Sequence, residues 1–208
     1  MGVNVADGNS ETTNIYADAE LVAQTEKNRF TMGGRHSQTK EDQSATSENT
    51  TVYGKYDYFL TEKWYMLANP TGIKDRFKGL NLRTIAGLGV GYQFFDTKLT
   101  KLSVEAGLSY VNDDYKETED ENYAAGRWAV NFSHFLAEDR IQCFHSNEGF
   151  VSLEDSKDLF IRTQSGFRLP IFDRVNANAQ LNYDWDNYPS EGKNRADTLY
   201  IFTLGYAW

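Results

Sequence analysis

Twelve charged side chains occupy alternating positions in segments whose residue pattern is typical of β-strands. Six are basic and six are acidic, so the chemistry available to them is mutual ion pairing or the attraction of ions. Opposite charges that face each other on neighbouring strands stabilise a sheet, whereas an enclosed charge without a partner is costly. The twelve residues are Asp18, Glu20, Lys55, Asp57, Arg83, Lys101, Glu105, Arg127, Arg162, Arg168, Asp184 and Asp186.

Two interpretations of these charges stay open. In the first, they form a salt-bridged filling inside a barrel that is structural or leaves a very narrow passage. In the second, they line a wet pore for ions or small solutes and set a mild ion preference. The equal number of basic and acidic groups favours the first interpretation, because no ring of one sign emerges from the sequence.

Catalysis was weighed at the three histidines, His36, His134 and His145. His145 is followed by Ser146, but adjacent strand residues point to opposite faces and cannot pair directly. The chain contains no Gly-x-Ser-x-Gly or His-Glu-x-x-His sequence. We expect no enzyme, no catalytic residue and no cofactor. An outer-membrane hydrolase stays as an alternative, since a triad is assembled in space. His145 is predicted to be a hydrogen-bonding residue of the rim or lumen.

An acidic stretch at residues 113–121 offers carboxylates, which are the ligands that Ca²⁺ and Mg²⁺ prefer. Its spacing lacks the central glycine of an EF-hand loop, so we expect a solvated loop and no metal site. The net charge of the chain is −9, and this argues against a nucleic-acid partner, which requires a basic face.

The elements that position these charges show alternation of apolar with small or polar residues. Residues 82–94, 101–110 and 175–186 each carry an apolar face and a polar face. Such segments run for about 12 residues, longer than strands of most soluble proteins and long enough for a tilted membrane strand. No run of 18 apolar residues occurs that would span a membrane as a helix.

The connections alternate between short and long, which is the rhythm of outer-membrane barrels with short periplasmic turns. Short connections are expected at 25–28, 60–63, 96–98, 137–139 and 172–173, and long polar loops at 37–49, 70–79, 113–121, 149–157 and 188–195. The sequence thus predicts one domain, residues 1–208, folded as a transmembrane up-and-down antiparallel β-barrel of about twelve strands. Eleven strands are clear, and a weaker one covers residues 2–6, so both termini are expected on the short-turn side.

The last segment alternates aromatic and apolar residues up to Trp208. A final strand that ends in an aromatic residue resembles the signal by which outer-membrane barrels are assembled. We therefore expect the barrel assembly machinery, outer-membrane lipids and lipopolysaccharide as partners, and a bacterial outer-membrane location. No export signal is visible at the start of the chain, which we interpret as a mature form.

Several stretches together resemble the DUF481 family of Gram-negative outer-membrane proteins, which are often described as salt-induced. They are GNSETT at 8–13, TEKNRF at 25–30, GKYDYFL at 54–60, LRT at 82–84, GLGVGYQF at 87–94, KLSVEAG at 101–107 and SLED at 152–155. The resemblance covers nearly the whole chain. It implies an outer-membrane barrel and carries over no reaction and no catalytic residue.

The main alternative from another class is a soluble, ligand-binding up-and-down barrel. Alternation alone does not distinguish the two, because a soluble barrel only requires the apolar face to turn inward. Leu88, Val104 and Leu181 would then lie in the interior, with Arg83 and Glu105 in bulk solvent. Strand length, loop rhythm and the terminal aromatic residue favour the membrane barrel.

Overall fold

The computed structural model describes residues 2–6, 12–41, 44–75, 80–116, 119–136, 140–172, 174–187 and 194–206. Over these residues the chain forms twelve β-strands and no helix that is long and apolar enough to cross a membrane. The strands are β1 (Gly2–Ala6), β2 (Thr12–Gln24), β3 (Asn28–Glu41), β4 (Ser44–Phe59), β5 (Trp64–Asp75), β6 (Leu80–Asp96), β7 (Thr100–Tyr115), β8 (Glu121–Leu136), β9 (Ile141–Ser152), β10 (Leu159–Phe172), β11 (Val175–Asp186) and β12 (Ala196–Tyr206).

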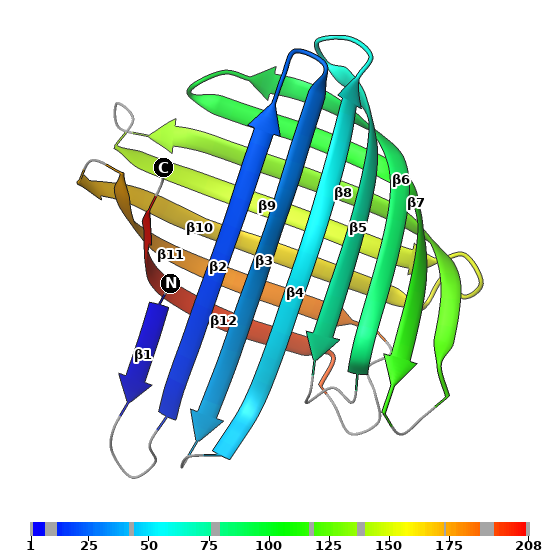
Figure 1. Cartoon of the computed structure of the whole chain (residues 1–208), viewed down its shortest axis with the longest axis vertical. Coiled ribbons are helices and arrows are strands. Elements are labelled where there is room, and N and C mark those ends of the chain that lie inside the picture. The colour runs from blue at the N-terminus through cyan, green and yellow to red at the C-terminus, as the bar shows by residue number, and fades with distance from the viewer. Residues whose placement is uncertain are drawn as a thin grey trace.

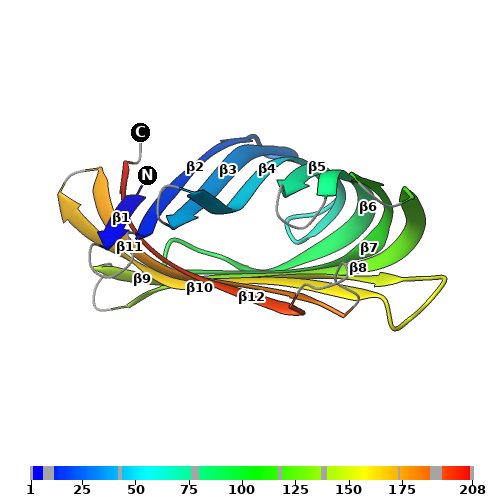
Figure 2. The ribbon, with the colours of Figure 1, turned by 90° about the horizontal axis from the view of Figure 1, so that it is seen from below.

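Each strand pairs antiparallel with the one before it, so strand order in the sheet equals chain order. The sheet curls until β1 and β12 contact each other at a seam (Figure 1). The prediction of an up-and-down barrel with eleven clear strands and a weak first one is confirmed. Seen from its end, the barrel is flattened, with β2–β5 forming one wall and β9–β12 the opposite wall (Figure 2).

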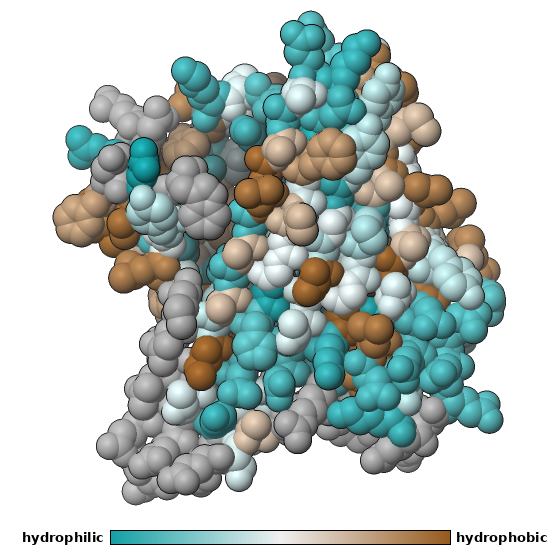
Figure 3. Space-filling view, viewed as in Figure 1, coloured by the Kyte–Doolittle hydropathy of each residue, from teal (hydrophilic) through white to brown (hydrophobic). Residues whose placement is uncertain are grey.

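Apolar side chains point outward, as the alternation predicts. Leu88 is 71% exposed and Leu108 is 62% exposed, whereas Glu105, on the same strand as Leu108, is 1% exposed. On the face drawn in Figure 3, brown and pale side chains are concentrated between teal groups at the top and bottom. A soluble ligand-binding barrel with its apolar face turned inward is therefore not the observed arrangement.

Two of the predicted long loops, at 37–49 and 70–79, are wrong, whereas 153–157 is a loop as predicted and 188–193 lies outside the described residues. Strand pairing continues through most of the residues of the first two: Ser37 pairs with Asn49, and Pro70 pairs with Ala86. Strands β3 to β7 thus run up to 17 residues, because they continue into segments expected to be loops. Polar residues with small side chains form strands here because the barrel ladder supplies backbone partners on both sides.

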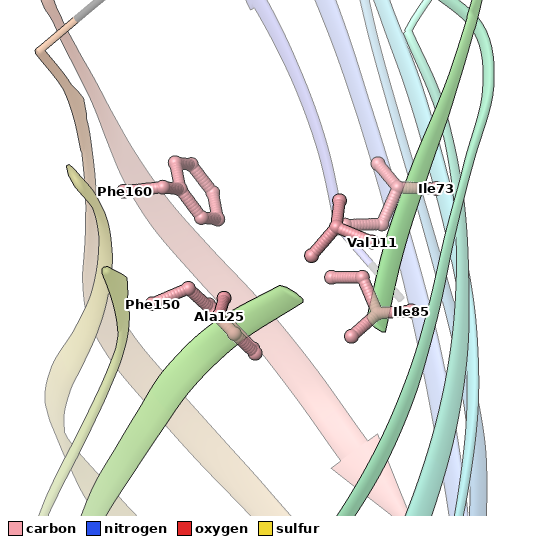
Figure 4. Packing of buried hydrophobic residues seen from close by; sticks show 6 residues of the cluster. All are labelled: Ile73, Ile85, Val111, Ala125, Phe150 and Phe160. Carbon is pink, nitrogen blue, oxygen red and sulfur yellow. The ribbon is translucent and has the colours of Figure 1, made fainter. Parts of the chain in front are cut away.

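The interior also contains an apolar cluster, which is located near the end opposite the short turns. Six buried side chains from β5–β10 form it: Ile73, Ile85, Val111, Ala125, Phe150 and Phe160. Figure 4 shows the two phenylalanines pointing across the lumen toward the isoleucines and valine. This cluster holds the curved wall of β5–β8 against β9 and β10, and it fills that side of the lumen.

Candidate functional site

The centre of the lumen holds a buried carboxylate, that of Glu105 on β7. It accepts hydrogen bonds from Arg127 Nη1 at 3.1 Å and from the Tyr65 hydroxyl at 2.8 Å, and it forms a close ion pair with Lys55. Two cations and a phenol thus surround one carboxylate. An enclosed carboxylate is tolerable only with such partners.

The network extends in both directions from Glu105. On one side Lys55 also contacts Asp57 at 3.1 Å, and Arg29 Nε donates to Asp57 Oδ2 at 2.7 Å. On the other side Arg127 Nε donates to Glu148 Oε1 at 2.7 Å. The chain of ion pairs therefore runs around the inside of the sheet from β3 to β9.

Glycines on the inner face of β6 explain how β4 reaches β7. Gly87, Gly89 and Gly91 place no side chain between Lys55 and Glu105. The ring of Tyr65 covers Gly91 so closely that an added Cβ would lie 2.2 Å from it. Glycine is required where another group approaches the backbone this closely. Tyr65 is thereby held with its hydroxyl directed at Glu105.

A second ion pair lies toward the apolar cluster. Arg83 on β6 donates through Nε and Nη2 to both carboxylate oxygens of Asp113, each at 2.6 Å. Its guanidinium also lies over the Phe160 ring, 5.3 Å from the centroid. Asp113 was predicted in a solvated acidic loop. That prediction is wrong, because β7 continues through Asp113 and turns it inward, where it is 1% exposed.

Four of the predicted charges thus join one network, Lys55, Asp57, Glu105 and Arg127, and Arg83 forms its own pair. Arg162 Nε faces Asp184 Oδ1 at 3.4 Å on the neighbouring strand. Lys101 lies at the short-turn end, 64% exposed, with Asp96 at 3.7 Å as its partner. The remaining predicted residues, Asp18, Glu20, Arg168 and Asp186, do not enter the central network.

Each of those remaining residues lies on the inner register of its strand. Glu20 accepts a hydrogen bond from the Tyr53 hydroxyl at 2.6 Å. Arg168 donates to two amide oxygens, those of Gln142 at 3.0 Å and Asn178 at 3.1 Å. Asp18 is paired in register with Arg35, and Asp186 with Phe160.

Sequence reasoning missed several members of the lumen: Arg29, Arg35, Tyr65, Asp113 and Glu148. Inward-facing positions on one strand are either all odd-numbered or all even-numbered, and this rule identifies them. Arg29 and Arg35 share the parity of Thr31 and Gly33, and Asp113 shares the parity of Glu105. Applying the alternation to every strand, and extending it through the supposed loop at Asp113, would have placed them on the inner face.

Two cavities occupy the rest of the lumen, beside the ion-pair wall. The outer cavity, of about 440 Å³, lies toward the ends of β3, β4 and β12 that are opposite the short turns. The inner cavity, of about 550 Å³, opens toward the short turns. Both are lined by Arg35, Thr51, Arg162 and Gln164, which therefore mark the junction between them.

A hydrogen bond crosses the lumen at this junction. Arg35 Nη2 on β3 donates to Gln164 Oε1 on β10 at 3.2 Å, although the two strands belong to opposite walls (Figure 2). Arg35 Nε and Gln164 Nε2 are enclosed and have no hydrogen-bond partner among the described residues. The junction thus holds two donors that are directed at no protein acceptor in that part of the chain.

The three histidines lie on the outward face, which corrects the predicted rim or luminal position of His145. Its Nδ1 is 2.8 Å from Ser165 Oγ, its cross-strand neighbour. His36 and His134 make the same kind of contact with Thr50 and Thr100. Because the arrangement recurs at three unrelated places, it favours a structural role, in which each polar group is satisfied across the strands.

The end opposite the short turns carries negative charge. Burial and the neighbouring Asp186 raise the pKa of Asp158, which lies between β9 and β10. This end is therefore an acidic rim, in contrast to the more basic inner cavity.

No group of three or more metal-binding side chains occurs within the described residues.

The family model for the protein family of unknown function DUF481 matches residues 1–208, the whole chain. The chain belongs to the DUF481 family. A relative of this DUF481 protein is the uncharacterized protein YdiY of Escherichia coli (strain K12). It is 22% identical over 214 residues, which cover 99% of the chain and 80% of YdiY.

Solved structures share the fold of this DUF481 protein. The NanC porin superposes with a TM-score of 0.61 at 8% identity, covering 100% of the chain and 98% of the porin. The translocator domain of the autotransporter NalP from Neisseria meningitidis gives a TM-score of 0.52 at 14% identity, covering 99% and 85%. A bacterial polysaccharide outer-membrane secretin gives 0.52 at 12% identity, covering 98% and 77%. At these identities the likeness concerns the fold alone.

Proposed function

We propose that this DUF481 protein is a bacterial outer-membrane barrel that provides a narrow passage for small hydrophilic solutes. The observation that carries the proposal is the division of the lumen. Its ion pairs lie against β3–β9 and its apolar cluster against β5–β10, while two polar cavities lie end to end beside them and meet at Arg35 and Gln164.

The outward face supports a membrane location. Large apolar side chains stand exposed on nearly every strand, among them Phe30, Leu88, Leu108, Phe167 and Phe202. A contiguous apolar surface of this kind is unusual in a soluble monomer. Strands β2–β11 are each hydrogen-bonded on both sides, which satisfies their backbone groups as crossing hydrocarbon requires, and β1 and β12 contact each other at the seam. The fold likeness to outer-membrane barrels agrees with this placement.

Planar-bilayer recording tests the passage. We expect the purified protein to give small unitary currents, and the currents to increase when the crossing contact is removed by Arg35→Ala or Gln164→Ala. The matched control is Arg140→Ala, which removes an arginine from an exposed short turn. Equal currents for all four proteins would contradict a constriction at Arg35 and Gln164.

A closed structural barrel is the second candidate. The ion-pair wall and the apolar cluster favour it, because both bind opposite parts of the sheet together in the way a filled small barrel does. Electrical silence of the wild type and of both widened variants would establish this reading and end the proposal of a passage.

A further inference from the structure

We propose that Arg35 and Gln164, with Arg162 beside them, form a binding site for small organic carboxylates at the junction of the two cavities. The binding itself is a property of the folded barrel, whereas its consequence, selection of anionic solutes for passage, rests on the proposed function. The observation behind the proposal is a pair of enclosed donors without a partner among the described residues, one on each of two side chains that meet across the lumen.

The donors are Arg35 Nε–H and Gln164 Nε2–H, which come from opposite walls. An enclosed donor without an acceptor is costly, and two such donors side by side call for a ligand with two acceptor oxygens. A carboxylate supplies two oxygens in one plane and one negative charge, and guanidinium groups bind it with short, charge-assisted hydrogen bonds.

The charge of Arg35 is available to a ligand. Among the described residues no ion pair includes Arg35 or Arg168, and the pair of Arg162 with Asp184 is long, at 3.4 Å. The carboxylate nearest in register to Arg35 is Asp18, which is exposed. Glu20 is occupied by the Tyr53 hydroxyl.

The inner cavity leads toward this site with an excess of positive charge. Six lysine and arginine side chains line it but only three acidic ones among the residues that the structure describes, whereas the outer cavity has two basic and three acidic. Arg168 and Arg162 share one face of β10, so basic groups continue from the inner cavity to the junction. Because basic side chains outnumber acidic ones in its lining, this cavity attracts anions.

The volumes set the size of the ligand. Cavities of about 440 and 550 Å³ on either side of the junction are in the range that encloses small organic molecules. One arginine with one amide offers donors for a single carboxylate rather than for a polyanion.

Calorimetric titration of the detergent-purified protein with gluconate and with sorbitol tests the site. The two probes share a six-carbon polyol chain, and gluconate alone has a carboxylate. We expect gluconate to bind and sorbitol to bind at least tenfold more weakly. Equal affinity for the two, or no binding of gluconate, would overturn the proposal.

Gln164→Glu is the sharpest variant, because it keeps the size of the side chain and the contact with Arg35 while replacing the donor by a negative charge. We expect it to weaken gluconate binding by about tenfold or more and to leave the folded barrel intact, as judged by heat-dependent mobility in electrophoresis. Arg35→Gln should act in the same direction, and Arg140→Gln should have no effect. Unchanged binding in both site variants would contradict the assignment.

Reversal potentials in a salt gradient separate this inference from the proposed function. We expect anion preference in the wild type and its reduction by Gln164→Glu. Silent bilayers together with gluconate binding would refute the passage and support the site. Conduction without anion preference, together with equal binding of gluconate and sorbitol, would refute the site and support the passage.

Discussion

At the scale of single residues, the lumen depends on buried charges that share partners. Glu105 contacts Lys55, Arg127 and Tyr65 at once, so its carboxylate links β4, β5 and β8. Because the partners also have second carboxylates, Asp57 and Glu148, the network is a continuous chain rather than a set of separate pairs.

Glu105→Gln removes the charge on which this chain is centred. We expect a loss of about 3 kcal/mol in the free energy of unfolding, since two buried cations lose one partner each. Urea unfolding followed by tryptophan fluorescence in detergent or lipid measures it. Glu154→Gln, at an exposed loop carboxylate, is the control and should change little. A loss equal to that of the control would show that Lys55 and Arg127 are satisfied without Glu105.

Gly91→Ala tests whether the close approach to Gly91 holds the Tyr65 ring in place. The added Cβ would meet the Tyr65 ring at 2.2 Å, so the ring must move and its hydrogen bond to Glu105 breaks. We expect a destabilisation of about 1–3 kcal/mol in the same unfolding assay, the range of an overpacked interior. Gly72→Ala provides the comparison, because its Cβ would only touch Leu82 at 3.9 Å. Equal stability of both variants would mean that Tyr65 relocates without cost.

The parity of strand residues made part of the site predictable. It placed Lys55, Asp57, Glu105 and Arg127 on one face before any coordinates were known. It did not reveal which of them meet, because Lys55 reaches Glu105 across two intervening strands, over glycines whose role is evident only in space. Arg35 and Gln164 lie 129 residues apart, and only the flattening of the barrel brings them together.

At the scale of elements, the fold was more predictable than its loops. Alternation predicted the strands, because outward-facing and enclosed positions differ in polarity. It did not predict where the strands end. Residues 37–41 and 44–49 are mostly polar, yet they belong to β3 and β4 and pair with each other. Polar composition is typical of loops, but these residues belong to the part of the barrel wall that extends beyond the apolar belt.

Phe160→Ala tests the element-level role of the apolar cluster, which connects β10 with β5–β8. We expect about 3–5 kcal/mol of destabilisation, because a large buried ring is removed and Arg83 loses its stacking partner. Thermal unfolding in detergent gives the measurement. Phe172→Ala, at a side chain that is 74% exposed, is the matched control. Similar losses in the two variants would mean that the cluster adds nothing beyond the exposed belt.

At the scale of the whole molecule, the apolar exterior and polar interior make the barrel the inverse of a soluble protein. Alternation predicts that each strand has one apolar and one polar face, and strand length and the terminal aromatic residue favour the apolar face on the outside. The flattened cross-section and the division of the lumen depend on side-chain volumes on opposite walls, and no pattern along one strand encodes them.

Leu88→Arg tests whether the outward face meets lipid. Leu88 stands in the middle of β6, and a charge there should cost about 2–4 kcal/mol if hydrocarbon surrounds it. We expect less folded protein in vesicles, measured by heat-dependent electrophoretic mobility and protease resistance. Leu88→Val should fold normally. Normal folding of the arginine variant in vesicles would contradict a lipid-facing β6.

The flattening of the barrel has a consequence for molecular shape. Two walls that come close enough for Arg35 to touch Gln164 leave a slit rather than a round hole. In the proposed passage, a slit would admit flat molecules edge-on and exclude rounder molecules of equal mass. We therefore expect flat rings to permeate faster than branched molecules of the same weight, a sieve by thickness instead of by diameter.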